Sequence, residues 1–418
     1  MKSDSPLFRY AIGVRDQIHE WAATRAEQQI LSFVVQKLAR QGASARSRTV
    51  VDTKAWALDT LQRNQTRIAE LEGRRINKIA LACRSAMLRM PNPTRDRLRA
   101  AVRSTFGRLG SRAAAKSADG NRARRACGPL DDSALAVPFG RAFPGPKLDH
   151  AVGVIVHVYY PDLAEEMRDY LENIPGSVDV YISTDTDAKR DDIQRVFSGW
   201  TKGRSEVRLA PNRGRDVAPK LITFKDVYDR HPFVLHLHSK KSPHDSSLKM
   251  WRFYTCENLI GDEAIASSIL GLLERSPDIG MVAPQHYFGV KNLIGWAGNL
   301  AIAQPLGRRM GVEIDPASPL DFPSGSMFWA RSAALKPLLD LNLSFDDFAP
   351  EGGQADGTLA HAIERLYFYS CELAGLKWVK VCRPELAHER ECTLVRVSSE
   401  GELIAFMKEF ARPLEASK

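Results

Sequence analysis

The chain has 418 residues, of which 44% are hydrophobic and 8% aromatic, and this composition is typical of a globular protein with more than one domain. Its six cysteines are scattered with no CxxC pair, which argues against a disulfide scaffold and a thiolate zinc site and favours a reducing cytoplasm. No apolar run of about eighteen residues occurs, and the first residues carry acids, so we expect neither a membrane-spanning helix nor a secretory signal.

The net charge of +9 is distributed unevenly along the chain. Residues 1–150 hold 28 Lys and Arg against 13 Asp and Glu, a net charge of +15, whereas the remainder carries −6. Within the basic part, Ile12–Gln41 and Ala55–Met90 have apolar residues at helical spacing, and a stretch rich in Arg, Ala, Gly and Ser follows. We therefore predict a basic helical region over residues 1–126 and a linker over residues 127–150.

The pattern changes at residue 151, where strands and helices begin to alternate. Four segments rich in β-branched residues read as strands: AVGVIVHVYY (151–160), VDVYIST (178–184), SEVRLAP (205–211) and FVLHLHS (233–239). Helical patterns separate them, and the third reads as one helix over residues 215–230. Short joints imply right-handed crossovers, so the predicted fold class is α/β, a Rossmann-like, mostly parallel sheet flanked by helices.

Further elements complete this predicted domain. A strand is expected from Ile279, another at SMFWA (326–330) leading into a helix at Ser332, and a helix from near Thr358. We place the domain at residues 151–390 and a C-terminal strand and helix extension at residues 391–418.

Polar groups follow all four of the first strands. Ligands of such sheets bind beyond the carboxyl ends of the strands, so we expect these groups to converge on one crevice. They are His157 and Tyr160 after the first strand; Asp185 and Asp187 after the second; Arg213, Gly214, Arg215 and Asp216 after the third; and His236, His238, Lys240 and Lys241 after the fourth.

The segment NRGRD (212–216) has two guanidinium groups around a glycine at the start of a helix. Arg213 and Arg215 can clamp phosphate oxygens, Gly214 permits close backbone approach, and the helix start favours an anion. The alternative is a turn with two solvated arginines.

The segment HLHSKK places His236 and His238 on one face of a strand, since side chains alternate along it. We expect them to face a pyrophosphate together with Lys240 or Lys241, whose charge would replace that of a metal ion. Hydrogen-bonded core histidines are one alternative, and zinc, which would need further ligands, is another.

The order of YYPD, STDTD, NRGRD and HLHSKK after successive strands resembles an inverting glycosyltransferase of the A-type fold. In that class the second strand end holds the base and ribose, and a DxD motif at the fourth binds Mg²⁺ or Mn²⁺. Here Asp185 and Asp187 fall at the base and ribose position, and His236 and His238 replace the DxD. The resemblance implies Mg²⁺ or Mn²⁺ as cofactor, the replacement implies binding without a metal, and the sequence leaves both open.

Four longer motifs, NRGRDVAP, LHLHSKKS, FPSGSMFWAR and GQADGTLAHAIERL, resemble the rhamnan synthesis protein F family over about Ala151–Arg383. The resemblance implies transfer of a sugar, often L-rhamnose from dTDP-L-rhamnose, to a lipid-linked glycan in bacterial polysaccharide and lipopolysaccharide O-antigen synthesis. A non-catalytic scaffold that binds nucleotide sugar or glycan is the alternative.

An inverting transfer needs a carboxylate to deprotonate the acceptor hydroxyl. In the resembled class this base precedes a helix at the point where FAPEGGQADGT (348–358) stands, so Asp356 is the first candidate and Glu351 the second. Capping of the helix is the alternative role of Asp356. The expected acceptor side contains Ser324, Gly325, Ser326, Trp329 and His361, and Trp329 either stacks on a sugar or packs in the core.

The basic N-terminal helices admit several partners. They can dock on anionic lipid, which would place a cytoplasmic enzyme at the periphery of the inner membrane face, or they can self-associate as a homo-oligomer. Nucleic acid is not expected as a partner, because no nucleic-acid-binding signature accompanies the positive charge.

Overall fold

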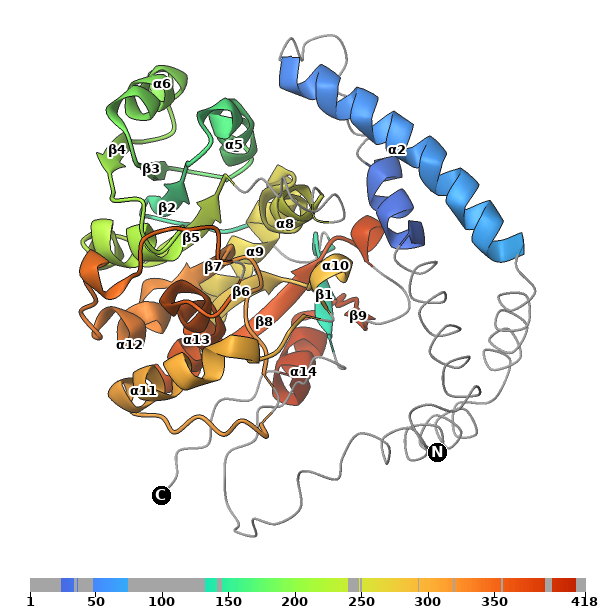
Figure 1. Cartoon of the computed structure of the whole chain (residues 1–418). Coiled ribbons are helices and arrows are strands. Elements are labelled where there is room, and N and C mark those ends of the chain that lie inside the picture. Colours follow the sequence, from blue (N-terminus) through green and yellow to red (C-terminus); the bar gives the residue numbers. More distant parts are fainter. Residues whose placement is uncertain are drawn as a thin grey trace, which may run out of the picture. The chain divides into compact units, whose positions relative to one another are not determined.

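The computed structural model describes residues 24–33, 36, 48–73, 132–140, 145–239, 248, 250–291, 293–318, 320–354, 356–387 and 393–410. The chain divides into two compact units, Met1–Arg122 and Ala123–Lys418 (Figure 1). No helix of the described residues has the length and apolar character needed to cross a bilayer.

The first unit contains two helices in its described part. Residues 24–33 form one helix, and α2 (Arg48–Gly73) is the other. They are joined by a bond from Asn64 Nδ2 to Glu27 Oε2 of 3.0 Å, and Ile30 and Ile68 are buried. The second helix begins before its predicted start at residue 55. Residues 1–23, 34, 35, 37–47 and 74–126 of the predicted basic region lie outside the described residues.

In the described part of the second unit, nine strands form one sheet in the order β4-β3-β2-β5-β7-β6-β8-β1-β9. The pairs of β7 with β5 and β6 are antiparallel and the other pairs are parallel, which confirms the predicted α/β class with a mostly parallel sheet. The strands are β1 (Ala134–Ala136), β2 (Val152–His157), β3 (Val178–Thr184), β4 (Ser205–Leu209), β5 (Phe233–His238), β6 (Ile279–Pro284), β7 (Phe328–Arg331), β8 (Lys377–Cys382) and β9 (Leu394–Val395).

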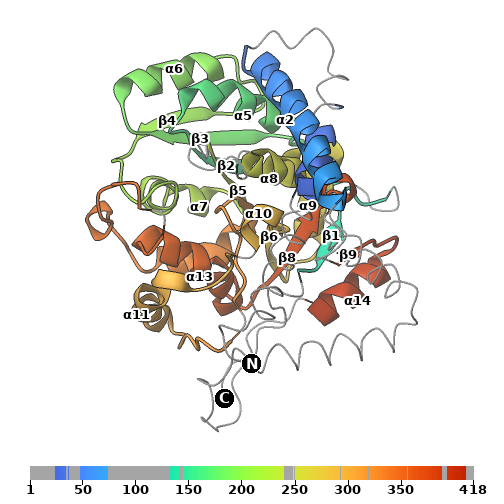
Figure 2. The same ribbon diagram turned by 45° about the vertical axis from the view of Figure 1, so that its right-hand side comes forward.

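Helices cover both faces of this sheet (Figure 2). One apolar layer joins the sheet to α5 (Ala164–Leu171), α6 (Asp187–Phe197), α8 (Trp251–Ile260), α9 (Glu263–Arg275) and α14 (Glu400–Phe410). The other joins it to α7 (Val227–Arg230), α11 (Leu300–Met310), α12 (Lys336–Leu339) and α13 (Leu359–Leu373); the short α10 (Phe288–Lys291) follows β6. Every residue of β2 is buried, as its unbroken β-branched run predicts for a strand covered on both faces.

Two segments differ from their prediction. The helix expected over residues 215–230 is interrupted, since a π-helical turn, Pro219–Thr223, precedes α7. Pro219 has no N–H to give to a regular helical ladder, which accounts for the irregularity. The stretch predicted as a linker contains β1, which lies between β8 and β9 and so belongs to the sheet.

Candidate active site

The carboxyl ends of β2, β3, β4 and β5 lie at one edge of the sheet, because these strands are parallel neighbours. His157 at the end of β2 contacts Ser183 of β3, with 3.0 Å between Nδ1 and Oγ. Burial lowers the pKa of His157 to about 4, while the charges of Asp216 and Asp185 act in the opposite direction. The ends of three strands therefore meet around a neutral imidazole. Tyr160 belongs to the same edge, since its N–H donates to Ser239 Oγ at 3.0 Å.

The two aspartates after β3 have different surroundings. Asp185 is largely buried and pairs with Lys189, at 2.6 Å between Oδ1 and Nζ. Asp187 is the first residue of α6, its side chain is 71% exposed, and it pairs with Arg190 at 2.6 Å. Only Asp185 is therefore buried beside the strand ends.

The NRGRD loop has left-handed backbone at Gly214 (φ 67°) and Arg215 (φ 53°). A Cβ on Gly214 would collide with Phe348 and would lie 2.6 Å from the Ala218 Cβ. The sequence predicted that this glycine admits a ligand, but the group that approaches it in the structure is the Phe348 ring.

The two arginines of this loop bind carboxylates of the protein. The Arg215 backbone N–H donates to Glu351 Oε1 at 3.2 Å, its Nε lies 3.6 Å from Glu351 Oε2, and its guanidinium also binds the Gln354 carbonyl. Arg213 lies 3.3 Å from the exposed Asp346. Each arginine thus already has a carboxylate partner within the chain.

A buried ion pair lies beneath this loop, and the sequence did not reveal it. Lys220 has no exposed surface; its Nζ lies 2.8 Å from Asp216 Oδ2 and donates to the Ser326 carbonyl at 2.7 Å. Burial lowers the pKa of Lys220. Burial also acts to raise the pKa of Asp216, but the charges of His238 and Lys220 hold it well below its ordinary value. The spacing of four residues between Asp216 and Lys220 was the available signal.

The two histidines of β5 share a face, as predicted, but only one reaches the edge. His236 is fully buried; its Nε2 lies 2.8 Å from the Tyr228 hydroxyl and its ring 4.7 Å from that of Phe328. It is a core histidine and does not face a diphosphate, which corrects the preferred prediction. His238, two residues on, lies 2.7 Å from the Gly325 carbonyl through Nε2. Lys240 and Lys241 lie outside the described residues.

The segment Pro323–Ser326, which we call the PSGS loop, is held from several sides. Its Gly325 N–H donates to Glu364 Oε1 at 2.7 Å, and its Ser324 Oγ lies 2.9 Å from His286 Nδ1. With the bonds of His238 and Lys220 to its carbonyls, the loop is fixed between the strand ends and α13.

Trp329, which follows this loop in β7, is completely buried, and its indole N–H donates to the Leu259 carbonyl at 3.1 Å. Trp329 packs in the core, so of the two roles that the sequence left open, core packing is the one observed, and it is not part of the acceptor side. The alternation of side chains along β7 turns it toward α8.

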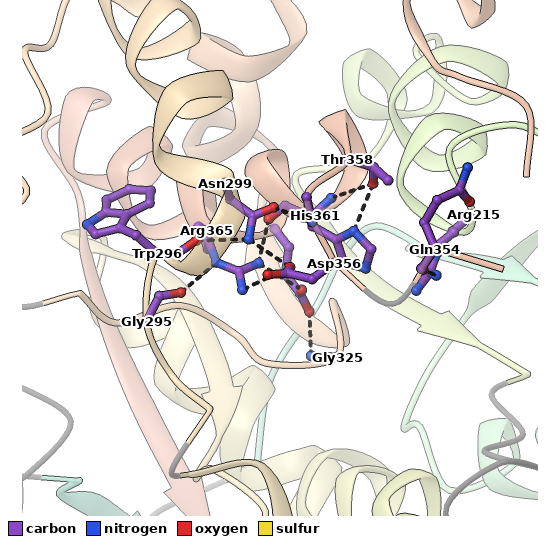
Figure 3. A network of polar contacts seen from close by, with 12 residues as sticks. Arg215, Gly295, Trp296, Asn299, Gly325, Gln354, Asp356, Thr358, His361 and Arg365 are labelled. Atoms are coloured by element: carbon purple, nitrogen blue, oxygen red, sulfur yellow. Dashed lines mark hydrogen bonds and ion pairs between the residues drawn. The ribbon is translucent and has the colours of Figure 1, made fainter. Parts of the chain in front are cut away.

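Asp356 lies just before α13 and is bound by two side chains (Figure 3). Its Oδ1 accepts a hydrogen bond from Asn299 Nδ2 at 2.7 Å and lies 3.4 Å from Arg365 Nη2. Burial acts to raise the pKa of Asp356, but the Asn299 bond and the Arg365 charge outweigh it and lower the pKa. The helix cap is Thr358, whose Oγ1 accepts from the His361 N–H, so Asp356 is not needed as a cap.

His361 lies between this carboxylate and Arg215 in Figure 3. Its Nδ1 is 2.8 Å from Thr358 Oγ1, and burial and the Arg215 charge lower its pKa to about 4. Arg365 is buried and donates to the carbonyls of Gly295 and His361 at 2.8 Å each. Asn299 carried no signal in the sequence, because its partner lies 57 residues away.

The polar groups of this edge are the candidates for holding a divalent metal. In the part of the chain that the structure describes, no three His, Cys, Asp or Glu side chains are grouped as ligands. Asp185 and Asp187 are each committed to a cation of α6, and His236 lies in the core. The described residues therefore do not fit a metal ion held by protein ligands alone.

The fold and this edge define an α/β protein with a polar site beyond the carboxyl ends of its parallel strands. The chain belongs to the rhamnan synthesis protein F family, whose sequence profile matches residues 144–375, and the resemblance found in the sequence is thus confirmed.

Two curated relatives match part of the chain. The uncharacterized protein WxcX of two strains of Xanthomonas campestris pv. campestris is 37% identical over 215 residues, which is 51% of this chain and 30% of the relative. The match therefore covers less than a third of these curated relatives.

Two solved structures show a weaker likeness. The mannosyltransferase PcManGT from Pyrobaculum calidifontis, in complex with GDP-Man and Mn²⁺, has a TM-score of 0.32 and 15% identity over 64% of this chain and 63% of its own. The 4-diphosphocytidyl-2C-methyl-D-erythritolsynthase from Anaerococcus prevotii has a TM-score of 0.29 and 10% identity over 62% of this chain and 96% of its own. Likeness at this level assigns no activity.

Proposed function

We propose that the chain is a glycosyltransferase that transfers a sugar, with inversion, from a nucleotide-sugar donor to a glycan acceptor. The observation that carries the proposal is the Asp356 carboxylate. It is kept ionised by Asn299 and Arg365 beside α13, and its charge, like those of Arg215 and Asp216 from the strand-end loop, acts on His361. The Arg215 guanidinium also binds the carbonyl of Gln354, which precedes Asp356 in the same loop, so the proposed base lies near a candidate phosphate-binding cation.

In this reaction Asp356 takes the proton of the acceptor hydroxyl as the oxygen attacks the anomeric carbon. The bond between that carbon and the diphosphate oxygen breaks, and its electron pair leaves with the nucleoside diphosphate. Both side-chain bonds to Asp356 use Oδ1, so Oδ2 is the oxygen proposed to take the proton. Glu351 is the second candidate base, but its pairing with Arg215 makes it more suited to hold that arginine in place.

The leaving diphosphate needs positive charge. Arg215 is the proposed cation, since its side chain is 38% exposed and its charge acts on His361. Arg213, Lys240 and Lys241 are proposed as further donor contacts, with His157, Tyr160, Asp185 and His238 nearer the strand ends. The PSGS loop and His361 are proposed to face the acceptor.

The finer assignments rest on the family and on charge. The family description, rhamnan synthesis, favours rhamnose as the transferred sugar. We propose dTDP-L-rhamnose as donor and a lipid-linked glycan of cell-surface polysaccharide synthesis as acceptor, as the sequence resemblance implies. The excess of basic residues in the first 150 residues supports attachment to the anionic inner face of the membrane.

Calorimetric titration with dTDP-L-rhamnose, UDP-sugars and GDP-sugars, each with EDTA and with Mg²⁺, tests the donor assignment. Tight binding of dTDP-L-rhamnose in EDTA would support a donor held by arginine, lysine and histidine. Binding only with Mg²⁺ would show that a carboxylate such as Asp185 ligates a metal in the complex, and binding of none would reject the donor assignment.

The base assignment is tested with Asp356→Asn. We expect transfer to fall by at least about 100-fold with little change in donor affinity, since the proton acceptor is lost but the phosphate contacts remain. Asp340→Asn is the control, because Asp340 is an exposed carboxylate paired with Lys336 outside the site. Full activity of Asp356→Asn would move the base to Glu351, and full activity of Glu351→Gln as well would reject the mechanism.

One set of contacts favours a second function, a non-catalytic scaffold that binds nucleotide sugar or glycan. Arg213, Arg215 and Asp356 each already have a partner of opposite charge within the chain. Donor binding without transfer to any acceptor, in both the wild type and Asp356→Asn, would favour this function.

A further inference from the structure

The side chain of Asn299 connects two segments of the chain that meet at Asp356, and it does so through three hydrogen bonds. Asn299 is the last residue of a short 3-10 helix, Ala297–Asn299, and its side chain has no exposed surface. Its amide N–H groups donate to the Trp296 carbonyl at 2.9 Å and to Asp356 Oδ1 at 2.7 Å. Its amide oxygen accepts from the Gly357 N–H at 3.1 Å. The side chain therefore binds both the carboxylate and the backbone that follows it.

The local role usual for an asparagine at this position is not used. Asn299 is the N-cap residue of α11, where its side chain would ordinarily accept a hydrogen bond from the first turn of its own helix. No such bond is formed, and the amide instead reaches across to the Asp356–Gly357 segment. A buried amide with both donors used and an acceptor bond has one orientation, since reversing it would place N–H against N–H at Gly357.

Arg365 contributes less to the position of the carboxylate. Its Nη2 lies 3.4 Å from Asp356, and its other nitrogens are occupied by the carbonyls of Gly295 and His361. The Asn299 bond is shorter, and it is fixed by a second bond to the next residue of the chain.

We infer that Asn299 is a positioning residue for the proposed base. It orients the Asp356 carboxylate through Oδ1, leaves Oδ2 toward the reacting hydroxyl, and fixes the Asp356–Gly357 backbone by the same amide. The inference rests on the proposed role of Asp356. The groups that act on this carboxylate are Asn299 from the 3-10 helix, His361 and Arg365 from α13, and the Gly357 backbone.

Two substitutions that keep the side chain branched at Cγ separate the parts of this role. Asn299→Leu removes all three bonds, and we expect kcat to fall about 100-fold with donor KM within about twofold, since a misplaced base slows only the chemical step. Asn299→Asp retains an acceptor for Gly357 but sets a second carboxylate against Asp356. The two would then share a proton, and we expect the acid limb of the kcat/KM profile to rise by at least about one pH unit.

A structural control comes from Asn258, which is also fully buried, donates to the Tyr254 carbonyl at 2.8 Å and accepts from the Arg383 N–H at 2.5 Å. Asn258→Asp is expected to lower the melting temperature without moving the acid limb. If Asn299→Asp behaved like Asn258→Asp, the role of Asn299 would be merely structural.

A readout independent of activity distinguishes failure of the inference from failure of the proposed function. The Asp356 carboxyl signal is identified in ¹³C NMR by its loss in Asp356→Asn, and its titration is compared in the wild type and Asn299→Asp. A rise of at least about one unit supports the inference even for a chain that transfers no sugar. An unchanged titration with an inactive Asp356→Asn overturns the role of Asn299 alone, and a fully active Asp356→Asn overturns the base.

Discussion

Three buried histidines of the second unit give the protein a distinctive dependence on pH. Burial lowers the pKa of His157 to about 4 and that of His236 well below its ordinary value, and burial with the Arg215 charge lowers that of His361 to about 4. Each imidazole is therefore neutral in the folded chain at pH values where the unfolded chain, with an ordinary pKa of about 6.5, binds a proton. Protons stabilise the unfolded state in this window, so the free energy of unfolding must fall as the pH falls from about 6.5 toward 4.

We predict that His157→Gln removes one share of this dependence. As the pH falls from 7 to 5, the free energy of unfolding of the variant should rise relative to that of the wild type by up to about 2 kcal/mol. Each pH unit below the unfolded-state pKa of the histidine contributes up to about 1.4 kcal/mol to this difference. The variant also loses the contact with Ser183, and this changes its free energy of unfolding by an amount that does not depend on pH. Urea unfolding of both chains at several pH values measures the difference, and a difference independent of pH would contradict the prediction.

The residues of the site show which information a sequence holds. His157, Asp216 and His238 were predicted at the strand ends because strand direction follows from the alternation of elements. Lys220 and Asn299 were missed because their roles depend on partners brought close by the fold, such as the Ser326 carbonyl and Asp356. His236 was misassigned because residue spacing shows which face of a strand a side chain lies on. It does not show whether helices cover that part of the strand.

At the scale of elements, the turn after β4 depends on close packing of Gly214 against Phe348. Gly214→Ala combines a left-handed backbone with a steric collision, and we predict a loss of about 3 kcal/mol of stability. Gly311→Ala is the control, since its φ of 91° carries the backbone strain but nothing lies within 4 Å of its Cβ. Gly311→Ala should therefore lower the stability by only about 1 kcal/mol. Chemical denaturation compares the two, and equal losses would show that the Phe348 contact carries no cost.

The elements themselves were largely predictable. The β-branched runs of β2 and β3 and the helical spacing of α6 leave little choice of structure, and their order dictates parallel pairing. Two elements were less predictable. The direction of β7 depends on where the chain crosses the sheet, and β1 is three residues long, too short to carry a periodic pattern.

At the scale of the whole molecule, the boundary between the units can be tested by truncation. A chain of residues 123–418 should fold and keep its donor affinity, since it contains the whole second unit. A chain of residues 151–418 lacks β1, which lies between β8 and β9, and Asp132, whose Oδ1 lies 2.6 Å from the buried Lys380.

We predict that the shorter chain loses about 3–5 kcal/mol of stability or does not fold, because Lys380 keeps only one of its two carboxylate partners, Asp321. Circular dichroism melting of the two chains and of the full-length chain measures the effect. Equal melting temperatures would mean that residues 123–150 are dispensable despite their place in the sheet.

The antiparallel strand β7 divides the sheet into two parallel halves, and the PSGS loop enters it at the edge where β5 and β6 end. Lys220 and His238 bind this loop from the half that carries β4 and β5, and His286, which follows β6, binds it from the other. The PSGS loop thus joins the two halves of the sheet by hydrogen bonds. Rotation of one half against the other would break these buried polar bonds. Amide hydrogens on both sides of β7 should consequently exchange with solvent in one concerted opening, and a ligand held by either half would slow exchange in both.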